Sequence, residues 1–441
     1  MKNNHQATSR FIPMTVIGVL FFMFGFVTWL NGSLIPFLQI ACELSHFEAY
    51  MVTMAFYIAY VVTALPVSYI LRRSGYKKGM VLGLIVMVIG ALLFIPAATS
   101  RIYSLFLIAL FVLGTGLTLL QTASNPYIVL IGPRETAAVR ISIMGLLNKA
   151  AGVVAPIVFT AYVLTDMSQF TEIRLASLDS VQRVNELAEL SSRLVTPYLI
   201  MAGLLLLLAV FVAMSPLPEP VDLGEQGAAK ESSSFLSVLQ KPQLVLGAIT
   251  LFLYVGAEVI AGDTIGLYGK ELGVANFGQL TSYTMAFMVS GYILGMVLIP
   301  RLLSQEVALA GSAVLGVVFA MLLLGADPQA SSIWIMLFSW TGISAIPNVI
   351  LYVALFGFSN ALVWPAVWPL ALRGLTPGET STGSALLIMG IAGGALIPLL
   401  FGYFTERNGG HQGAYVLMIP CYLFILFYAL KGSKISAWRK I

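Results

Sequence analysis

The sequence predicts an all-α membrane protein with twelve transmembrane helices, arranged as two pseudo-symmetric bundles of six. Hydrophobic residues make up 59% of the 441 residues and charged residues only 10%, whereas soluble domains carry about 25% charged residues. Apolar runs long enough to cross a lipid core of about 30 Å recur along the chain. Short patterns also recur in the two halves of the chain.

The recurring apolar runs define the expected spans. They cover residues 12–40, 48–71, 79–99, 103–131, 141–164, 196–215, 243–263, 279–300, 307–325, 347–372, 382–404 and 413–431. The first run follows a basic start, as a signal peptide does, but it is long, contains Pro13, Trp29 and Pro36, and lacks a clear cleavage site. We therefore expect a retained first helix.

Three pairs of similar segments indicate an internal repeat. They are TMAF at 53–56 and 284–287, AAGVVAPIVF at 150–159 with AGGALIPLLF at 392–401, and QTASNP at 121–126 with NALVWP at 360–365. Two similar membrane halves are the usual plan of a solute transporter, with the binding site between the halves.

The repeat divides the chain into three parts. We expect an N-terminal six-helix bundle at 1–215, a cytoplasmic linker at 216–242, and a C-terminal six-helix bundle with a cytoplasmic tail at 243–441. The linker begins with a stretch rich in Pro, Gly, Ser and Glu, a composition typical of flexible connections, and a short helix is expected before Lys241. The polar stretch 166–193 is expected outside, and 178–194 has a helical charge pattern.

Lys and Arg residues predict the orientation, because they concentrate in cytoplasmic loops. With both termini in the cytoplasm, most of these residues fall inside, including the cluster RRSGYKK at 72–78. The net charge of +4 therefore reflects topology and does not predict a nucleic-acid partner. Residues 331–346 resemble a thirteenth span, but a crossing there would place the basic C-terminus outside. We expect an interfacial or re-entrant helix, with Trp334 and Trp340 at the headgroups.

Polar side chains within the expected spans mark the candidate binding site, because an unpaired polar group in hydrocarbon is costly. The candidates are Asn31, Gln121, Asn125, Asn148, Tyr254, Glu258, Asn360 and Trp364. Gln121 and Asn125 are four residues apart and share a helix face. Amides both donate and accept hydrogen bonds, as sugar hydroxyls do, and indoles suit the apolar faces of sugar rings. This set favours a neutral polyhydroxylated ligand. The alternative for each Asn is hydrogen bonding between helices.

Glu258 is the only carboxylate that we place well inside a span, because Asp263 is expected at a boundary. An intramembrane carboxylate favours a proton or cation site. The alternative is a structural role, as the partner of a hydroxyl or of Lys149. Lys149 lies nine residues beyond Arg140, and its alternative is to extend back toward the cytoplasm.

The positions of histidine and cysteine do not predict an enzyme or a metal site. His5, His46 and His411 fall in expected loops or at span ends, and Cys42 and Cys421 are isolated. No cofactor is expected beyond H⁺ or Na⁺ as a coupling ion. We expect a monomer in lipid, with a small sugar as its ligand.

Five segments resemble the fucose/glucose/galactose permease family of the major facilitator superfamily. They are LNGSLIP at 30–36, LLQTASNPYIVLIGP at 119–133, YVGAEV at 254–259, GGALIP at 393–398 and CYLFILFYALKG at 421–432. The resemblance implies a cation-coupled, alternating-access sugar importer of the bacterial inner membrane. The form WLNGSL at 29–34 is most similar to the N-acetylglucosamine permease branch, so the expected substrate is a hexose or an N-acetylhexosamine.

The chain departs from the fucose permease pattern at two positions. That pattern has an aspartate at the position of Gly32 and a glutamate at the position of Gln121, so both of its proton-handling carboxylates are absent. Asn148 matches the sugar-contacting amide of the fifth span, and Glu258 matches the glucose/galactose members. We therefore expect Glu258 to couple transport to H⁺ or Na⁺. The alternatives are a facilitative uniporter, in which Glu258 only binds the sugar, and a sugar sensor with a transporter fold.

Overall fold

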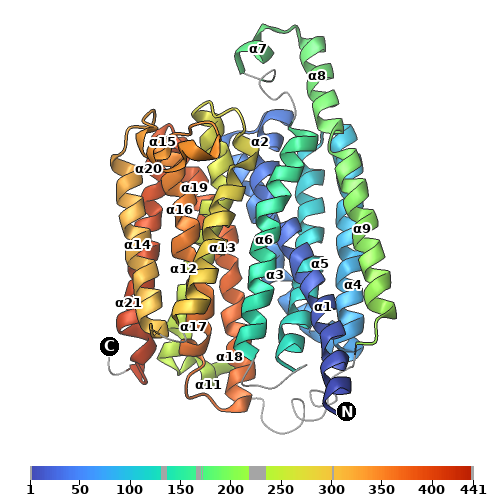
Figure 1. Ribbon diagram of the computed structural model, residues 1–441. Helices are drawn as coiled ribbons and strands as arrows, with labels where there is room; N and C mark the ends of the chain where they lie inside the picture. Colours follow the sequence, from blue (N-terminus) through green and yellow to red (C-terminus); the bar gives the residue numbers. More distant parts are fainter. Residues whose placement is uncertain are drawn as a thin grey trace.

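The computed structural model describes residues 2–130, 137–164, 170, 172–217, 235–299 and 302–438, and every regular element in these ranges is helical. The helices form two bundles that stand side by side (Figure 1). The first bundle contains α1 (Lys2–Trp29), α2 (Asn31–Ala41), α3 (His46–Val62), α4 (Ala64–Ser100), α5 (Tyr103–Leu130), α6 (Ala137–Val163) and α9 (Val195–Met214). Two short helices, α7 (Glu172–Ser177) and α8 (Ser180–Ser192), extend from one end.

The second bundle follows the short helix α11 (Phe235–Leu239), which lies where the sequence predicts a helix before Lys241. Its elements are α12 (Pro242–Glu271), η3 (Phe277–Gln279), α13 (Leu280–Leu298), α14 (Gln305–Gly325), α16 (Asn348–Asn360), α17 (Val363–Ala371), α18 (Pro377–Met389), η5 (Gly390–Ala392), α19 (Gly393–Asn408), α20 (His411–Ala414), η6 (Tyr415–Leu417), α21 (Met418–Leu430) and η7 (Gly432–Lys434). Residues 218–234 of the predicted linker lie outside the described residues.

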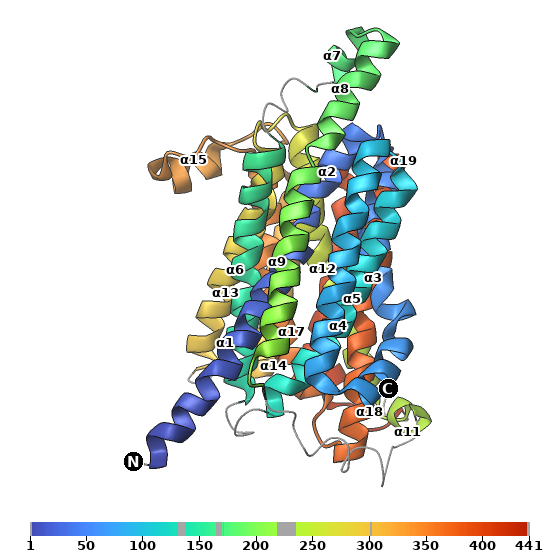
Figure 2. The same cartoon turned by 90° about the vertical axis from the view of Figure 1, so that its right-hand side faces the viewer.

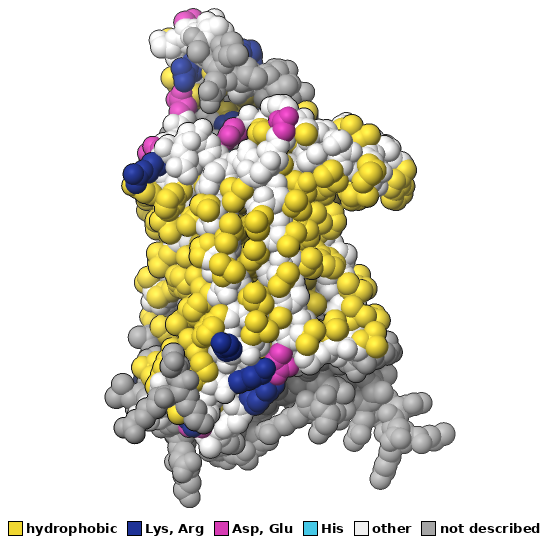
Figure 3. Space-filling view, turned by 90° about the vertical axis from the view of Figure 1, so that its left-hand side faces the viewer, with side chains coloured by type: hydrophobic (Ala, Val, Ile, Leu, Met, Phe, Trp, Pro, Cys, Tyr) yellow, Lys and Arg dark blue, Asp and Glu magenta, His cyan; other side chains and the backbone are white. Residues whose placement is uncertain are grey.

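The helices agree with a twelve-span membrane protein. Within the described residues, eleven helical segments are long and apolar enough to cross a membrane. The remaining expected span, 48–71, corresponds to α3 followed by the start of α4. On the face that Figure 3 shows, hydrophobic side chains cover the middle and charged side chains lie toward the two ends, as expected for a protein embedded in lipid.

Two local features set the boundaries around α3 and α4. The Ser45 side chain accepts a hydrogen bond from the Glu48 backbone, and the Glu48 carboxylate accepts one from the Ser45 backbone, so a capping box begins α3. Inside α4, Gly75 has φ 77° and ψ 178°. Only glycine adopts this conformation without strain, so Gly75 separates the second span from the third within the basic segment 72–78.

The segment 331–346 does not form a crossing. It contains α15 (Ser332–Phe338) and η4 (Ser339–Thr341), and α15 projects sideways at the end of the bundle that carries α7 and α8 (Figure 2). The Asn348 side chain accepts hydrogen bonds from the backbone of Ile333 and Trp334. Trp334 is buried and Trp340 is 82% exposed. This placement agrees with the predicted interfacial helix rather than the re-entrant alternative.

The first span is divided at Leu30, between α1 and α2, and the structure corrects the predicted end of the seventh span. The seventh span does not end at Asp263, because α12 continues to Glu271 and Thr264 to Gly269 are buried within it. Asp263 is therefore a carboxylate inside the helix and not at its boundary.

The two bundles are joined by hydrogen bonds toward the end that carries α7 and α8. Ser33 Oγ donates to the Gly278 carbonyl, and Ser282 Oγ donates to the Val153 carbonyl at 2.7 Å. Lys270 Nζ donates to Gln39 Oε1 at 2.8 Å. Each bond connects one residue of the first half with one of the second. We call this end of the interface the seam, and it is closed in this structure.

Gly32 allows the seam to close. A Cβ atom at this position would lie 2.2 Å from Thr281 Oγ1 and 2.7 Å from the Gly262 carbonyl oxygen, both in the second half. We predict that Gly32→Ala disfavours the closed seam by about 1–3 kcal/mol, the usual cost of overpacking. The measurement is labelling of Ser282→Cys by a small membrane-impermeant thiol reagent, which should become faster.

The matched control is Gly203→Ala, because a Cβ at Gly203 meets nothing within 4 Å. Both glycine variants are made in a protein in which Cys42 and Cys421 are replaced, so that the reagent labels only the introduced thiol. Burial raises the pKa of the Cys42 thiol to about 11, which would already slow labelling at that position. Equal labelling rates in the two glycine variants would contradict the prediction.

Candidate functional site

An ion pair joins the two halves at the centre of the candidate site. Lys149 Nζ on α6 lies 2.6 Å from Glu258 Oε1 on α12. Lys149 is 9% exposed and Glu258 is 8% exposed. Lys149 therefore does not extend back toward the cytoplasm, and the predicted alternative of a Lys149–Glu258 pair is present in this state.

Trp29 and Asn148 complete the surroundings of Lys149. The ammonium nitrogen lies 4.4 Å from the centroid of the Trp29 ring, a cation–π contact. Trp29 Nε1 donates to Asn148 Oδ1 at 3.4 Å, and Asn148 Nδ2 donates to the Phe21 carbonyl at 3.4 Å. Because Trp29 ends α1 and Asn148 lies on α6, this group connects the first span with the fifth, next to Glu258 of the second half.

Aromatic side chains line the part of the site that the second half contributes. Tyr254 lies four residues before Glu258 and therefore on the same face of α12. Its ring centroid is 6.3 Å from that of Trp364, and the centroid of Trp364 is 5.6 Å from that of Trp368. Tyr254 is buried and Trp364 is half-buried. The structure thus places Tyr254 and Trp364, two of the predicted site residues, close together.

The structure does not link the other candidate residues to this group. Asn360 is buried and its Oδ1 accepts a hydrogen bond from Tyr422 at 3.0 Å, so it also serves packing within the second half. Asn31 is buried, and its Nδ2 has no hydrogen-bond partner among the described residues. Gln121 and Asn125 are half-buried on α5. No hydrogen bond within the described ranges connects these four residues to Glu258.

Asp263 is the buried carboxylate that the sequence did not predict. It is 0% exposed, and its Oδ2 accepts a hydrogen bond from Thr53 Oγ1 at 3.3 Å. Within the described part of the chain, its Oδ1 has no partner. Two signals could have found it: Thr53 begins the first copy of the TMAF repeat, and the uncharged run Thr264–Gly269 extends the seventh span beyond the aspartate.

His411 is also buried, although the sequence places it at the end of a span. Its Nδ1 contacts Oε2 of Glu271, the last residue of α12. The ring of His46, from the first half, lies edge-on at 5.2 Å from the ring of His411. These residues belong to the seam and lie apart from the group around Lys149.

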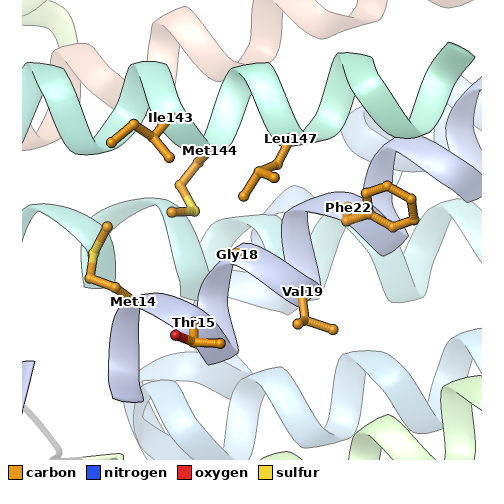
Figure 4. A pocket seen from close by; sticks show the side chains of 8 residues that line it. All are labelled: Met14, Thr15, Gly18, Val19, Phe22, Ile143, Met144 and Leu147. Atoms are coloured by element: carbon orange, nitrogen blue, oxygen red, sulfur yellow. The ribbon is translucent and has the colours of Figure 1, made fainter. Parts of the chain in front are cut away.

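A cavity of about 400 Å³ lies between α1 and α6. Figure 4 shows the side chains that line it, from Met14 to Phe22 on α1 and from Ile143 to Leu147 on α6. Except for Thr15 and Gly18 they are apolar, and a sugar needs several polar contacts. None of the predicted site residues lines this cavity, which is therefore a poor candidate for the sugar site.

The ion pair predicts a distinctive pattern of stability. Lys149→Met leaves Glu258 buried without a cation, and loss of one partner of a buried pair costs about 3–5 kcal/mol. Combining Lys149→Met with Glu258→Gln should recover much of this loss, because no lone charge remains buried. The measurement is denaturant unfolding in detergent. Arg373→Met is the control, since its partner is Glu306 at the surface and exposed pairs contribute about 1 kcal/mol or less. Equal losses in the free energy of unfolding for Lys149→Met and Arg373→Met would refute the prediction.

Known proteins share the sequence pattern of this chain along nearly its whole length. Residues 17–397 match the model of the Major Facilitator Superfamily. The chain is 34% identical over 425 residues to a glucose/galactose transporter of Brucella abortus (strain 9-941), covering 96% of this chain and 94% of that protein. It is 25% identical over 436 residues to the L-fucose-proton symporter of Escherichia coli (strain K12), covering 97% and 94%.

Solved structures share the fold. The crystal structure of the Major Facilitator Superfamily transporter FucP in the outward conformation matches with a TM-score of 0.73 at 24% identity, over 97% of this chain and 100% of that one. A crystal structure of the nucleoside transporter NupG matches with a TM-score of 0.67 at 12% identity, over 95% and 98%. The family model, the relatives and the twelve-span arrangement lead to one conclusion: the chain belongs to the Major Facilitator Superfamily.

Proposed function

We propose that this protein is a secondary active transporter that imports a neutral sugar, a hexose or an N-acetylhexosamine, across the bacterial inner membrane by alternating access. The printed names of its relatives include glucose/galactose transporter and L-fucose-proton symporter. The observation that carries the proposal is the group of Trp29, Asn148, Lys149 and Glu258, which joins the halves where a transporter of this plan binds its solute.

We propose that the sugar binds beside this group, on the side away from the seam. Asn148 and Glu258 would bind sugar hydroxyls, since an amide both donates and accepts and a carboxylate accepts. Tyr254 and Trp364 would pack against the apolar face of the ring. Asn31, Gln121, Asn125 and Asn360 stay predicted sugar contacts of the same site.

The orientation follows from the basic residues. Both ends of the described chain lie at the end of the molecule opposite α7 and α8 (Figure 1). We propose that this end faces the cytoplasm, because the basic segment 72–78, at the Gly75 kink within α4, lies on that side. The seam then faces outward, and this structure is a state closed to the outside. Trp340 on the projecting segment would lie at the outer headgroups, and we propose that the chain acts as a monomer.

The coupling ion is proposed to be H⁺ or Na⁺. The sequence predicts that Glu258 binds it. In this state the Glu258 carboxylate already has a cation, because Lys149 lies 2.6 Å away. A coupling cation at Glu258 would therefore have to displace Lys149, which would free the ammonium group and break the connection between the halves.

Uptake into proteoliposomes tests the function. Labelled glucose, galactose, fucose and N-acetylglucosamine are offered separately, with inward gradients of H⁺ or Na⁺ imposed one at a time. Accumulation of at least one sugar against its gradient is expected. Counterflow without accumulation in either ion gradient would indicate a uniporter, and binding without flux would indicate a sensor.

Asn148→Ala should weaken sugar binding by about 1–3 kcal/mol, or roughly 5- to 150-fold, because buried partners of the sugar hydroxyls are lost. Equilibrium binding of the transported sugar to purified protein measures the change. Asn348→Ala is the control, since Asn348 bonds the backbone at the start of α15 and lies away from the site. An unchanged affinity in Asn148→Ala would remove this residue from the site.

A further inference from the structure

We propose that Asp263 carries a coupling proton, and that the neutral acid allows the seam to close. This inference rests on the proposed transport function and identifies the group and the ion that drive it. It differs from the prediction from sequence, which assigns coupling to Glu258.

Asp263 lies where the halves meet. The carboxylate belongs to α12 in the second half, and its one hydrogen bond comes from Thr53 on α3 in the first half, at 3.3 Å. The side chain is 0% exposed and its other oxygen, Oδ1, has no partner among the described residues. On either side of this position, Thr281 Oγ1 donates to the Gly262 carbonyl at 2.7 Å and Thr264 Oγ1 lies 2.6 Å from the Tyr415 hydroxyl.

No cation balances this carboxylate in the part of the chain that the structure describes. The contrast with Glu258, five residues earlier on the same helix, is direct: Glu258 has Lys149 at 2.6 Å, and Asp263 has no ion pair. Burying an ionised carboxylate without a partner is strongly unfavourable, and the group takes up a proton instead. The neutral acid fits the closed seam, because it needs no cation and keeps an acceptor for Thr53.

The ionisable groups around Asp263 do not change this result. Those that interact with its charge are Glu258 on α12 and Tyr50 and Tyr57 on α3. None of these three side chains is a cation, and Glu258 is already paired with Lys149. α2 carries no ionisable side chain from Asn31 to Ala41. The other ionisable groups of α12 nearest in sequence are Tyr254, Tyr268, Lys270 and Glu271, and Lys270 donates to Gln39. On the other packed elements the ionisable groups are Tyr283 and Tyr292 of α13, Tyr352 of α16, Glu379 of α18, Tyr403, Glu406 and Arg407 of α19, His411 of α20, Tyr415 of η6, Cys421, Tyr422 and Tyr428 of α21 and Lys434 of η7.

The geometry favours a proton over Na⁺. A sodium ion needs several oxygen ligands, which transporters supply from broken helices. Here α12 is helical from Pro242 to Glu271, so its carbonyls are engaged in the helix. The carbonyls of Ala261 and Gly262 also accept hydrogen bonds from Thr284 and Thr281. A proton needs only the carboxylate oxygen itself.

The proposed cycle balances one proton with each turnover. With the seam open, water reaches Asp263 and its carboxylate binds a proton from the outside. The neutral acid then permits Thr53 and Asp263 to meet, and the seam closes over the sugar. When the proton leaves to the inside, the closed seam holds an unpaired negative charge, which favours reopening to the outside. Protonation thus shifts the equilibrium because it changes the relative stability of the two states.

The first test is Asp263→Asn, which keeps the shape of the side chain without a titratable proton. With an inward gradient of one pH unit, the unsubstituted protein should accumulate sugar up to about tenfold for one proton per sugar. Asp263→Asn should equilibrate sugar without accumulation and retain counterflow, which moves no net proton. Glu306→Gln, a carboxylate change in the surface pair with Arg373, should still accumulate sugar.

The second test follows the seam itself and does not need transport. In protein with Ser282→Cys as the thiol to be labelled, the labelling rate is divided by that of an exposed reference cysteine, Val181→Cys, because thiolate and hence labelling increase with pH at any cysteine. Raising the pH should increase this ratio, because ionised Asp263 opens the seam. Adding Asp263→Asn should keep the ratio low at all pH values. A ratio that still rises with pH in the Asp263→Asn protein would overturn the proposal, even if that variant no longer transports.

The outcomes separate this proposal from the proposed function. If the unsubstituted protein shows no counterflow with any of the four sugars, the proposed function is overturned and this assignment with it. If that protein accumulates sugar and Asp263→Asn also does, only the assignment to Asp263 is overturned. Accumulation driven by Na⁺ alone would overturn the choice of the proton. Loss of accumulation in Glu258→Gln but not in Asp263→Asn would return coupling to Glu258.

Discussion

Ionisable groups at the interface between the halves must lose their net charge whenever the interface closes, because the closed interface excludes water and a lone buried charge is costly. The structure meets this constraint in two ways along a single helix. Glu258 is neutralised by Lys149 from the opposite half. Asp263 meets only the hydroxyl of Thr53 and has no counter-charge among the described residues. In this state, helix α12 therefore combines a charge pair with a carboxyl group that, as we propose, carries a proton.

The close approach of the halves gives this constraint its force. Gly32 and Gly278 of the two halves lie against Thr281 and Thr160 respectively, and each lacks room for a Cβ atom. Small residues at helix interfaces let backbones approach closely and support hydrogen bonds across the contact. An approach this close leaves little space for water around Asp263. Packing and electrostatics are thus linked, since a looser seam would hydrate the carboxylate and remove its need for a proton.

The sequence predicts the parts of this design that depend on local patterns. Hydropathy gives the twelve spans, and the charge rule with the shortness of the segment excludes a crossing at 331–346. Glu258 and Asn148 stand out because polar groups in apolar runs are rare. The partner of Glu258 is harder to predict, since Lys149 lies 109 residues away in sequence. Only the tertiary arrangement of the two halves decides whether Lys149 pairs with Glu258 or extends to the surface. The burial of Asp263 is not predicted, because the glycines and the threonine that follow it lower the hydropathy and make the seventh span seem to end there. Burial at this position depends instead on tertiary contacts.

The departure of Gly32 from the resembled permease pattern is consistent with the position of Asp263. A side chain at Gly32 would collide with Thr281 and with the carbonyl of Gly262, the residue directly before Asp263. An aspartate at Gly32 would therefore both block the seam and bring a second carboxylate close to the first, and two adjacent carboxylates cannot both ionise without cost. The pattern has one of its two acidic groups on the first span, and this chain has Asp263 on the facing seventh span. In the proposed cycle, Asp263 is the group at this contact whose charge differs between the open and closed states.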